Sequence, residues 1–229
     1  MTGAGVSAES GIPTFRGRGG LWTQYDPVKV ASIDSFLADP AEYWSVAKER
    51  GRVALAARPN PGHVALAALE DRGHIVAVVT QNTDGLHRDA GSKRVIELHG
   101  SGRTVECLTC GGKEPRSEVQ ARLGVEMPPR CRLCGGTVLK PTVVLFGEPM
   151  PTEATQEAFE LASHTDVMLV AGTSLAVHPA ADVPLFALRS GARLIVVNAE
   201  PTPFDRFAEV VIHGRSGEVL PEIVGLIGE

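Results

Sequence analysis

The chain has 229 residues, of which 43% are hydrophobic and 21% are charged, and its formal net charge is −5. This composition suits a folded core, the acidic balance disfavours non-specific nucleic-acid binding, and no apolar run reaches the ~18 residues that a bilayer-spanning helix needs. Because the sequence also shows no basic, apolar leader, we expect a monomeric cytoplasmic protein without nucleic-acid or membrane partners.

A glycine-rich segment opens the sequence. The run Gly3-Ala4-Gly5-Val6-Ser7-Ala8 matches the G-x-G-x-x-G/A pattern, whose glycines let the backbone approach a pyrophosphate at a helix N-terminus. Taken alone, the pattern fits a simple tight turn equally well. Such a loop normally follows a strand, and only Met1 and Thr2 precede it, so we expect the first strand of the sheet to be missing. The acidic residue that binds a ribose in ordinary dehydrogenases has no convincing counterpart, because Asp26 precedes a proline, and this disfavours simple hydride transfer.

The rest of the chain alternates between predicted helices and strands. Residues 20–58 are expected to be helical, and Asn60-Pro61 then begins a helix that Gly73 ends. Short runs rich in Val, Ile and Leu, typical of parallel strands covered on both faces, occupy residues 74–80, 166–172 and 193–198. Further helices are predicted at residues 152–163, 179–190 and 217–226. This alternation predicts a doubly wound, Rossmann-like α/β sheet.

Polar residues follow three of these strands. Gln81, Asn82 and Asp84 come directly after the first, Gly172-Thr173-Ser174 ends the second, and Asn198-Ala199-Glu200 ends the third. Ligands of open parallel sheets bind outside the carboxyl ends of the strands, so these residues are candidates for binding a polar ligand. The alternative for the first segment is an Asx-type turn that caps the next helix.

Among the seven histidines, His99 is the candidate catalytic residue. It follows a short strand predicted at residues 95–98 and stands where the sheet meets the cysteine-rich segment, and a histidine there can accept a proton near neutral pH. A structural role is favoured for His87 and His178 in the ligand-side loops, and surface or terminal positions are expected for His63, His74, His164 and His213.

The four cysteines form two pairs, Cys107-x-x-Cys110 and Cys131-x-x-Cys134. This spacing favours a metal over disulfides, and each second cysteine precedes Gly-Gly, which permits a tight knuckle. Four thiolates fill the tetrahedral shell of Zn²⁺ and leave no open position, so we expect one structural zinc, with an iron centre or redox dithiols as alternatives. Residues 101–140 show little apolar periodicity and can hardly bury a core of their own, so they need a bound metal to hold their fold.

Together these segments resemble the sirtuin family along almost the whole chain. The resemblance rests on motifs in the family's order: GAGVSAESGIPTFRG at residues 3–17, TQNTDGLH at 80–87, LHG at 98–100, the cysteine pairs, FGE at 146–148, GTS at 172–174 and NAEPT at 198–202. With Thr14 instead of an acidic residue in the first motif, the chain is most similar to the broad-acyl bacterial and mitochondrial subgroup.

The resemblance implies an NAD-dependent protein-lysine deacylase, with deacetylation favoured and acyl-lysine proteins or peptides as partners. The acyl oxygen would attack the ribose carbon of NAD as nicotinamide leaves, and His99 would take a proton from a ribose hydroxyl, so that the acyl group passes to ADP-ribose. The implied NAD-binding domain comprises residues 1–19, 59–100 and 141–229. The small lobe would have a helical part at 20–58 and a zinc-binding part at 101–140.

The same resemblance implies which residues form the site. NAD would contact Gly3, Ala4, Gly5, Ala8, Ile12, Phe15, Arg16, Trp22, Gln81, Asn82, Asp84, Gly172, Thr173, Ser174, Asn198, Glu200 and Ser216. The acyl-lysine peptide would contact Ala47, Arg50, Val144, Leu145, Phe146 and Gly147, and it would add as an extended strand along residues 144–147 and 176–178.

Several positions depart from the family pattern. Thr83 replaces an isoleucine, and Leu145 replaces an aromatic residue that often precedes the FGE motif. The Tyr-x-x-Arg pair of members that remove succinyl groups reads Ala47 and Arg50, so neutral acyl groups are favoured and desuccinylation stays open. ADP-ribosyl transfer to protein and a non-catalytic NAD or acyl-peptide sensor remain the alternative functions. A zinc-ribbon nucleic-acid binder is disfavoured, because the segment lacks aromatic residues for stacking.

Overall fold

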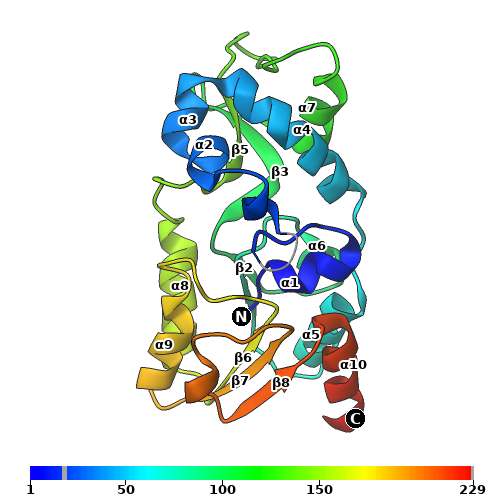
Figure 1. Ribbon diagram of the computed structural model, residues 1–229, viewed down its shortest axis with the longest axis vertical. Helices are drawn as coiled ribbons and strands as arrows, with labels where there is room; N and C mark the ends of the chain where they lie inside the picture. The colour runs from blue at the N-terminus through cyan, green and yellow to red at the C-terminus, as the bar shows by residue number, and fades with distance from the viewer. Residues whose placement is uncertain (17–19, 228–229) are drawn as a thin grey trace.

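The computed structural model describes residues 1–16 and 20–227. Gly17, which ends the first motif, and residues 18, 19, 228 and 229 of the predicted NAD-binding domain lie outside the described residues. Within the described part, no helix is long and apolar enough to cross a membrane. The chain forms a large lobe around a parallel sheet and a small lobe above it in Figure 1.

All strands of the large lobe run parallel. They are β1 (Val78–Thr80), β2 (Val95–Glu97), β6 (Val167–Ala171), β7 (Arg193–Asn198) and β8 (Val210–His213). β1 pairs with β2, and β7 pairs with both β6 and β8. The two groups are joined through Thr2, which forms parallel bridges with Thr80 of β1 and Ala171 of β6.

The N-terminal residues occupy the central position of this sheet. Thr2 N donates to Val79 O at 2.8 Å, and Ala171 N donates to Met1 O at 2.9 Å. The strand predicted to be missing is therefore represented by Met1 and Thr2, directly before the glycine-rich segment.

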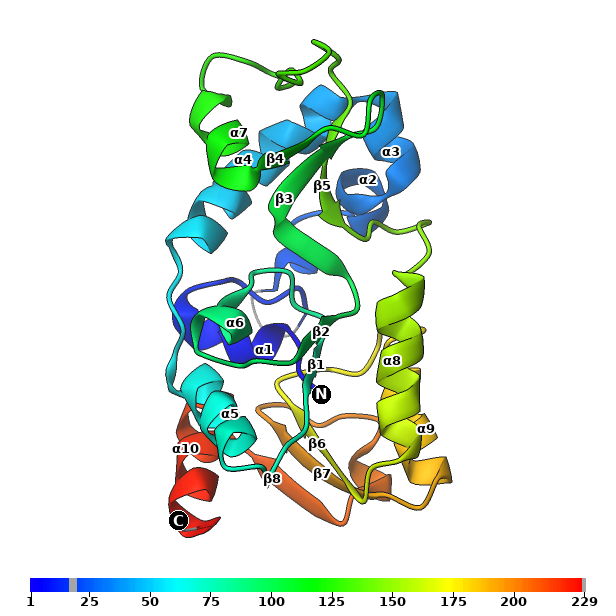
Figure 2. The same ribbon diagram turned by 180° about the vertical axis from the view of Figure 1, so that it is seen from behind.

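Helices cover both faces of the sheet, as Figure 2 shows from behind. On one face α8 (Thr152–Ser163) packs with α9 (Asp182–Arg189), and on the other α5 (Pro61–Asp71) packs with α10 (Ser216–Ile227). Neighbouring strand residues alternate between these two cores: Val196 packs with the first and Val197 with the second. This arrangement confirms the predicted doubly wound α/β fold.

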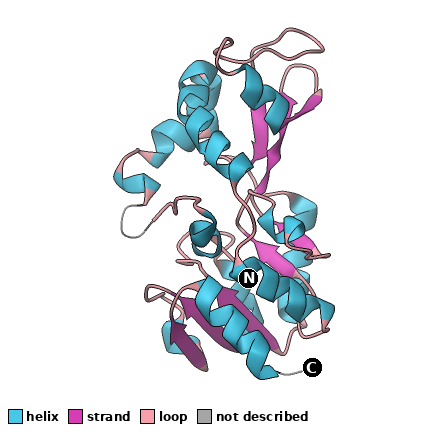
Figure 3. Ribbon diagram, turned by 90° about the vertical axis from the view of Figure 1, so that its right-hand side faces the viewer, coloured by secondary structure: helices cyan, strands magenta, loops and turns pink. Residues whose placement is uncertain are grey.

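The small lobe combines two separate stretches of sequence. Its helices are α2 (Pro27–Ala31), α3 (Ile33–Ala38), α4 (Pro40–Ala56) and α7 (Arg116–Arg122), and its antiparallel strands, in the order β4–β3–β5, are β3 (Gly100–Cys107), β4 (Lys113–Pro115) and β5 (Leu139–Val143). Figure 3 shows these strands apart from the parallel sheet. Trp44 of α4 is fully buried against this sheet and donates from Nε1 to Leu139 O at 2.9 Å, which joins the two stretches.

Short elements lie between the lobes. They are α1 (Ala4–Ser7), α6 (Leu86–Asp89) and the 3₁₀ turns Ala8–Ser10 and Leu21–Thr23, whereas the 3₁₀ turn Asp205–Phe207 joins β7 to β8 in the large lobe. The first predicted strand is shorter than expected, because His74 N still donates to Leu69 O at the end of α5 and keeps that segment out of the ladder. The strands β3, β4, β5 and β8 and the helix α7 were not predicted.

Candidate active site

A cleft of about 1110 Å³ lies between the two lobes. Its walls come from the glycine-rich segment, α4, the ends of β1, β6 and β7, and the crossing from β5 toward α8. Every residue that the resemblance named as an NAD contact, a peptide contact or the catalytic base lines this cleft, and of the expected pairing segment 176–178 only Val177 and His178 do so. The fold therefore brings the whole candidate set together, while the roles within it remain proposals.

His99 lies in the cleft with its tautomer fixed by the backbone. Its Nδ1 is 3.1 Å from Gln81 O, and a carbonyl oxygen can only accept, so Nδ1 carries the proton and donates. The other ring nitrogen, Nε2, is then the one with the lone pair. Burial lowers the pKa of His99, and the hydrogen bond to Gln81 opposes this effect. The imidazole is consequently a neutral base at neutral pH.

A hydrogen-bonded network holds the polar residues that follow β1. Ser7 Oγ donates to Asp84 Oδ2 at 2.7 Å, and Asn82 Nδ2 donates to Ser7 Oγ at 3.1 Å and to Gly3 O at 3.0 Å. Ser7, which the sequence did not single out, thus ties the glycine-rich segment to the segment after β1. The polar end of Asp84 is fixed at the cleft wall.

His63 is the clearest error of the sequence analysis. It was expected at the surface, yet it is fully buried at the start of α5. Its Nδ1 accepts from Asn60 N at 3.3 Å, so Nε2 carries the proton and donates to Ser7 Oγ at 3.3 Å. The signal was the capping box formed by Asn60 and the residue three positions later, which draws that side chain inward.

His87 has the structural position that was favoured for it. His87 is 2% exposed, its ring centroid lies 4.8 Å from that of His63, and Nε2 is 2.9 Å from Thr2 Oγ1. Burial, followed by the neighbouring His63, lowers the pKa of His87 to about 3. This histidine therefore stays neutral beneath the cleft floor.

The glycines of the first motif permit close backbone packing. A Cβ at Gly5 would lie 2.8 Å from Gly172 Cα, and Gly5 N donates to Gly172 O at 2.7 Å. The Gly5 amide is thus already engaged at the end of β6. Other backbone groups of this segment would therefore have to contact a pyrophosphate.

The sheet edge beyond β7 offers a second polar corner. Asn198 Nδ2 donates to Glu200 O at 2.6 Å, and Ser216 lies buried at the start of α10. The nearby Glu9 carboxylate accepts from Gly217 N at 2.7 Å. These groups suit the hydroxyls of a ribose, which both donate and accept hydrogen bonds.

Aromatic side chains connect the glycine-rich segment to the wall after β5. The rings of Phe15 and Trp22 have centroids 5.1 Å apart, and those of Trp22 and Phe146 lie 6.3 Å apart. The Arg50 guanidinium stacks over Phe15, with Cζ 5.4 Å from the ring centroid. The candidate substrate residue Arg50 therefore faces the cleft.

The backbone of residues 144–147 is partly engaged. Val144 N donates to His99 O at 2.9 Å, whereas Phe146 N donates to Ala31 O at 2.8 Å and Phe146 O accepts from Ile33 N at 3.0 Å. Both backbone groups of Phe146 are thus used by the small lobe. Leu145 N also donates to Glu148 Oε2 at 2.8 Å, and Leu145 O accepts from Glu148 N at 3.0 Å. The strand pairing expected along residues 144–147 stays a prediction, and it would have to use other backbone groups of this segment.

A second arginine lies near Arg50 and was missed. Arg116 is 5% exposed, stacks over Trp44 and donates from Nη2 to Ala47 O at 2.8 Å. Burial lowers the pKa of both guanidinium groups, and no carboxylate among the described residues contributes to either value. No sequence signal marked this residue, because it sits in a charged segment without a motif.

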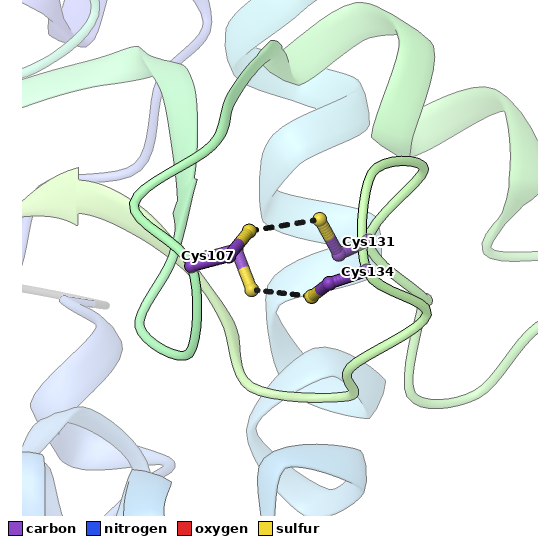
Figure 4. Close-up of side chains that lie close together, drawn as sticks. Cys107, Cys131 and Cys134 are labelled. Atoms are coloured by element: carbon purple, nitrogen blue, oxygen red, sulfur yellow. Dashed lines mark hydrogen bonds between the residues drawn. The ribbon is translucent and has the colours of Figure 1, made fainter.

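The four cysteines form a cluster outside the residues that line the cleft. Figure 4 shows Cys107 on one loop facing Cys131 and Cys134 on another. Cys107 Sγ and Cys134 Sγ lie 3.7 Å apart, as do Cys110 Sγ and Cys131 Sγ. All four sulfur atoms fall within 4.8 Å of one another. Tetrahedral zinc with Zn–S bonds of ~2.3 Å requires sulfur separations of about 3.8 Å, so the cluster fits zinc. Gly111 and Gly135 close the two knuckles at φ +72° and +74°.

Comparison with known proteins supports this assignment of the fold. Residues 3–179 match the Sir2 family. The chain is 52% identical over 224 residues to NAD-dependent protein deacylase 2 of Archaeoglobus fulgidus, covering 98% of this chain and 88% of that protein. It is 47% identical over 224 residues to NAD-dependent protein deacetylase 1 of Pyrobaculum aerophilum, with coverage of 98% and 87%. A solved structure described as Sir2–p53 peptide–NAD+ matches with a TM-score of 0.91 at 41% identity, covering 99% and 91% of the two chains.

Proposed function

The chain belongs to the Sir2 family and is an NAD-dependent protein deacylase, and we propose that His99 is its catalytic base. The observation that carries this proposal is the bond from Nδ1 to Gln81 O, which leaves Nε2 as the proton acceptor inside the cleft. The pKa of His99, lowered by burial, keeps that nitrogen unprotonated at neutral pH.

The cleft has groups suited to each part of NAD. When bound, NAD supplies an electrophilic ribose carbon and nicotinamide as the leaving group. Asn198, Glu200 and Ser216 would hold the adenosine, and Asn82 and Asp84 would bound the nicotinamide side. Phe15 and Trp22 would cover the reacting region and exclude water, which protects a reactive centre from hydrolysis.

Zinc would be structural, since four thiolates leave no coordination position for a substrate. We propose that zinc ties the second cysteine pair to the end of β3, the strand that begins directly after His99 and ends at Cys107. The small lobe comprising residues 20–58 and 101–140 would thereby keep its wall of the cleft, against an NAD-binding domain of residues 1–19, 59–100 and 141–229.

For the acyl group, we favour acetyl or another neutral acyl chain on a lysine peptide. Ala47 lines the cleft where a tyrosine would stand in members that remove succinyl groups, so that hydroxyl is absent. The solved relative with deacetylated p53 peptide and 3′-O-acetyl ADP ribose, at 42% identity and a TM-score of 0.95, supports this choice.

Removal of an acidic acyl group is the second candidate. Arg50 and Arg116 both line the cleft, and neither has a carboxylate partner among the described residues. A carboxylate at the end of an acyl chain would supply the missing counter-charge. The pair of guanidinium groups is the observation that favours this reading.

An acyl-peptide panel with NAD tests both candidates. Acetyl-, propionyl-, butyryl- and succinyl-lysine peptides should release nicotinamide only when peptide and NAD are both present. Arg50→Met should reduce turnover of the succinyl peptide about tenfold more than that of the acetyl peptide if the guanidinium binds the acyl tail. Label from NAD that stays on the protein without an acyl-lysine requirement would instead support ADP-ribosyl transfer.

We also propose that the protein acts on acyl-lysine substrates as a monomer in the cytoplasm, without nucleic acid. The acidic net charge of −5 supports the last point. Light scattering of the zinc-loaded protein measures the oligomeric state, and a dimer would contradict the proposal.

A further inference from the structure

The strand β3 leaves its ladder shortly after the candidate catalytic base. Its register with β5 shifts between Ser101 and Val105, which forms a bulge. Thr142 of β5 fills the gap by donating from Oγ1 to Ser101 O at 2.9 Å. Bulges beside active sites redirect side chains out of the regular ladder. Here the redirected residues are Gly102 and Arg103.

The bulge contacts the segment that follows β1. Gly102 N donates to Thr83 O at 2.7 Å, and Arg103 Nε donates to Asp84 O at 2.8 Å. A Cβ at Gly102 would lie 2.9 Å from Thr83 O, so only glycine permits this approach. Two consecutive carbonyl groups of the large lobe are therefore bonded from a strand of the small lobe.

The orientation of the Arg103 guanidinium group is fixed by contacts at Nε and at both Nη atoms. The group packs on Gly85, whose φ is +75° and where a Cβ would lie 2.4 Å from Nε. Nη1 donates to Asp89 Oδ1 at 3.0 Å, and Nη2 donates to the other carboxylate oxygen. This bidentate contact with the end of α6 fixes the guanidinium plane, so that Nε points at Asp84 O.

The ion pair itself adds little stability. The side chains of Arg103 and Asp89 are 43% and 36% exposed, and ion pairs at this exposure are weak. Its consequence is geometric. Gly102 and Arg103 line the cleft and hold the backbone that carries Asn82 and Asp84, in addition to the Ser7 network.

We propose that Arg103 is a positioning residue that sets the nicotinamide side of the cleft by fixing the backbone of Asp84 to the small lobe. This inference rests on the proposed function, because it takes Asn82 and Asp84 to bound nicotinamide. Arg103 acts through Asp84, and its removal should weaken binding of the nicotinamide end of NAD selectively. Binding at the adenosine end should be spared.

The test compares two ligands that differ by nicotinamide. Calorimetry of the zinc-loaded protein with ADP-ribose, and inhibition by free nicotinamide during turnover of an acetyl-lysine peptide, separate the two ends of the cleft. Arg103→Met should raise the inhibition constant of nicotinamide and the KM for NAD about tenfold, the loss expected for a charge-assisted hydrogen bond. The Kd for ADP-ribose and the KM for peptide should stay within about twofold.

Two further variants keep the test decisive. Arg103→Lys retains the charge but loses the planar set of N–H donors, so it should give a partial effect. It replaces Arg103→Met in the test if that variant is unstable. Arg94→Met removes another half-exposed arginine, paired with Glu157 away from the cleft, and should behave as wild type.

Equal changes for ADP-ribose and nicotinamide, or no change relative to Arg94→Met, would overturn the inference. Failure of the wild-type protein to turn over any acyl-peptide with NAD would instead overturn the proposed function. The two failures are therefore distinguishable.

Discussion

Lys140 and Glu148 form a buried ion pair under the wall of the cleft, and Lys140→Met tests how that wall is held. Lys140 is 7% exposed, and its Nζ donates to Glu148 Oε2 at 2.9 Å, to Val143 O at 2.7 Å and to Pro141 O at 3.2 Å. The same Glu148 oxygen accepts from Leu145 N at 2.8 Å. The pair therefore closes the turn between β5 and α8 that carries the candidate substrate residues.

The structure sets the size of the expected effect. Removing one partner of a buried pair leaves the other charge uncompensated, which costs about 3–5 kcal/mol. The Glu148 side chain is 22% exposed and keeps the Leu145 amide, so we expect Lys140→Met to reduce the free energy of unfolding by about 3 kcal/mol. Glu148→Gln leaves Lys140 with two carbonyl acceptors and should cost less, about 1.5 kcal/mol.

The assay is urea unfolding of the zinc-loaded protein, followed by circular dichroism at neutral pH. The double variant should lose less than the sum of the two single variants by about 1 kcal/mol or more, because the groups contact each other. Lys93→Met is the matched control, since its exposed pair with Asp71 should not affect stability measurably. A Lys140→Met loss no larger than the control, or strict additivity in the double variant, would refute this reasoning.

Three other predictions follow from the site. Because burial lowers the pKa of His99, deacylation should decline only as pH falls below 6.5, and a rate that declines from neutral pH upward would contradict this. The pKa of His87 is about 3 in the folded state and near 6.5 in the unfolded state, so the contribution of the neutral imidazole to stability is fully present above pH 6.5. This contribution is lost as the pH falls from 6.5 toward 3. When the pH is lowered from 7 to 5, the free energy of unfolding measured in urea should fall by about 2 kcal/mol less for His87→Gln than for wild type. Equal losses in the two proteins would exclude the buried imidazole as the cause of the acid destabilisation. Cys131→Ser should lower the bound zinc measured by atomic emission and unfold the small lobe, and a variant with full zinc content and unchanged circular dichroism would contradict the four-thiolate site.

The large lobe was predictable because its signals are local. β7 lies at the predicted residues 193–198 and α8 at 152–163, since the Val- and Ile-rich run and the helical segment that precedes it both have clear boundaries. Parallel strands bring their carboxyl ends to one edge, and so the sequence alone places the polar residues after β1, β6 and β7 in one cleft. The cysteine spacing likewise predicted the cluster.

The small lobe was less predictable because its order comes from contacts between distant segments. β3 reads GSGRTVEC, which has no apolar alternation, and it becomes a strand by pairing with β5 over a core anchored by Trp44. Burial of His63 required the contact with Ser7, more than fifty residues earlier in the chain. Arg103 and Arg116 gain their positions from tertiary bonds to Asp84 and Ala47, which no local pattern announces.

Single-turnover analysis of His99→Ala with an acetyl-lysine peptide and NAD tests the central claim most directly. If Nε2 takes the ribose proton after nicotinamide leaves, formation of deacetylated peptide should fall by about 10²–10⁴-fold. Labelled nicotinamide should still exchange into NAD in the same variant, because that step precedes the proton transfer. Deacetylation by His99→Ala at a rate close to that of wild type would contradict the account.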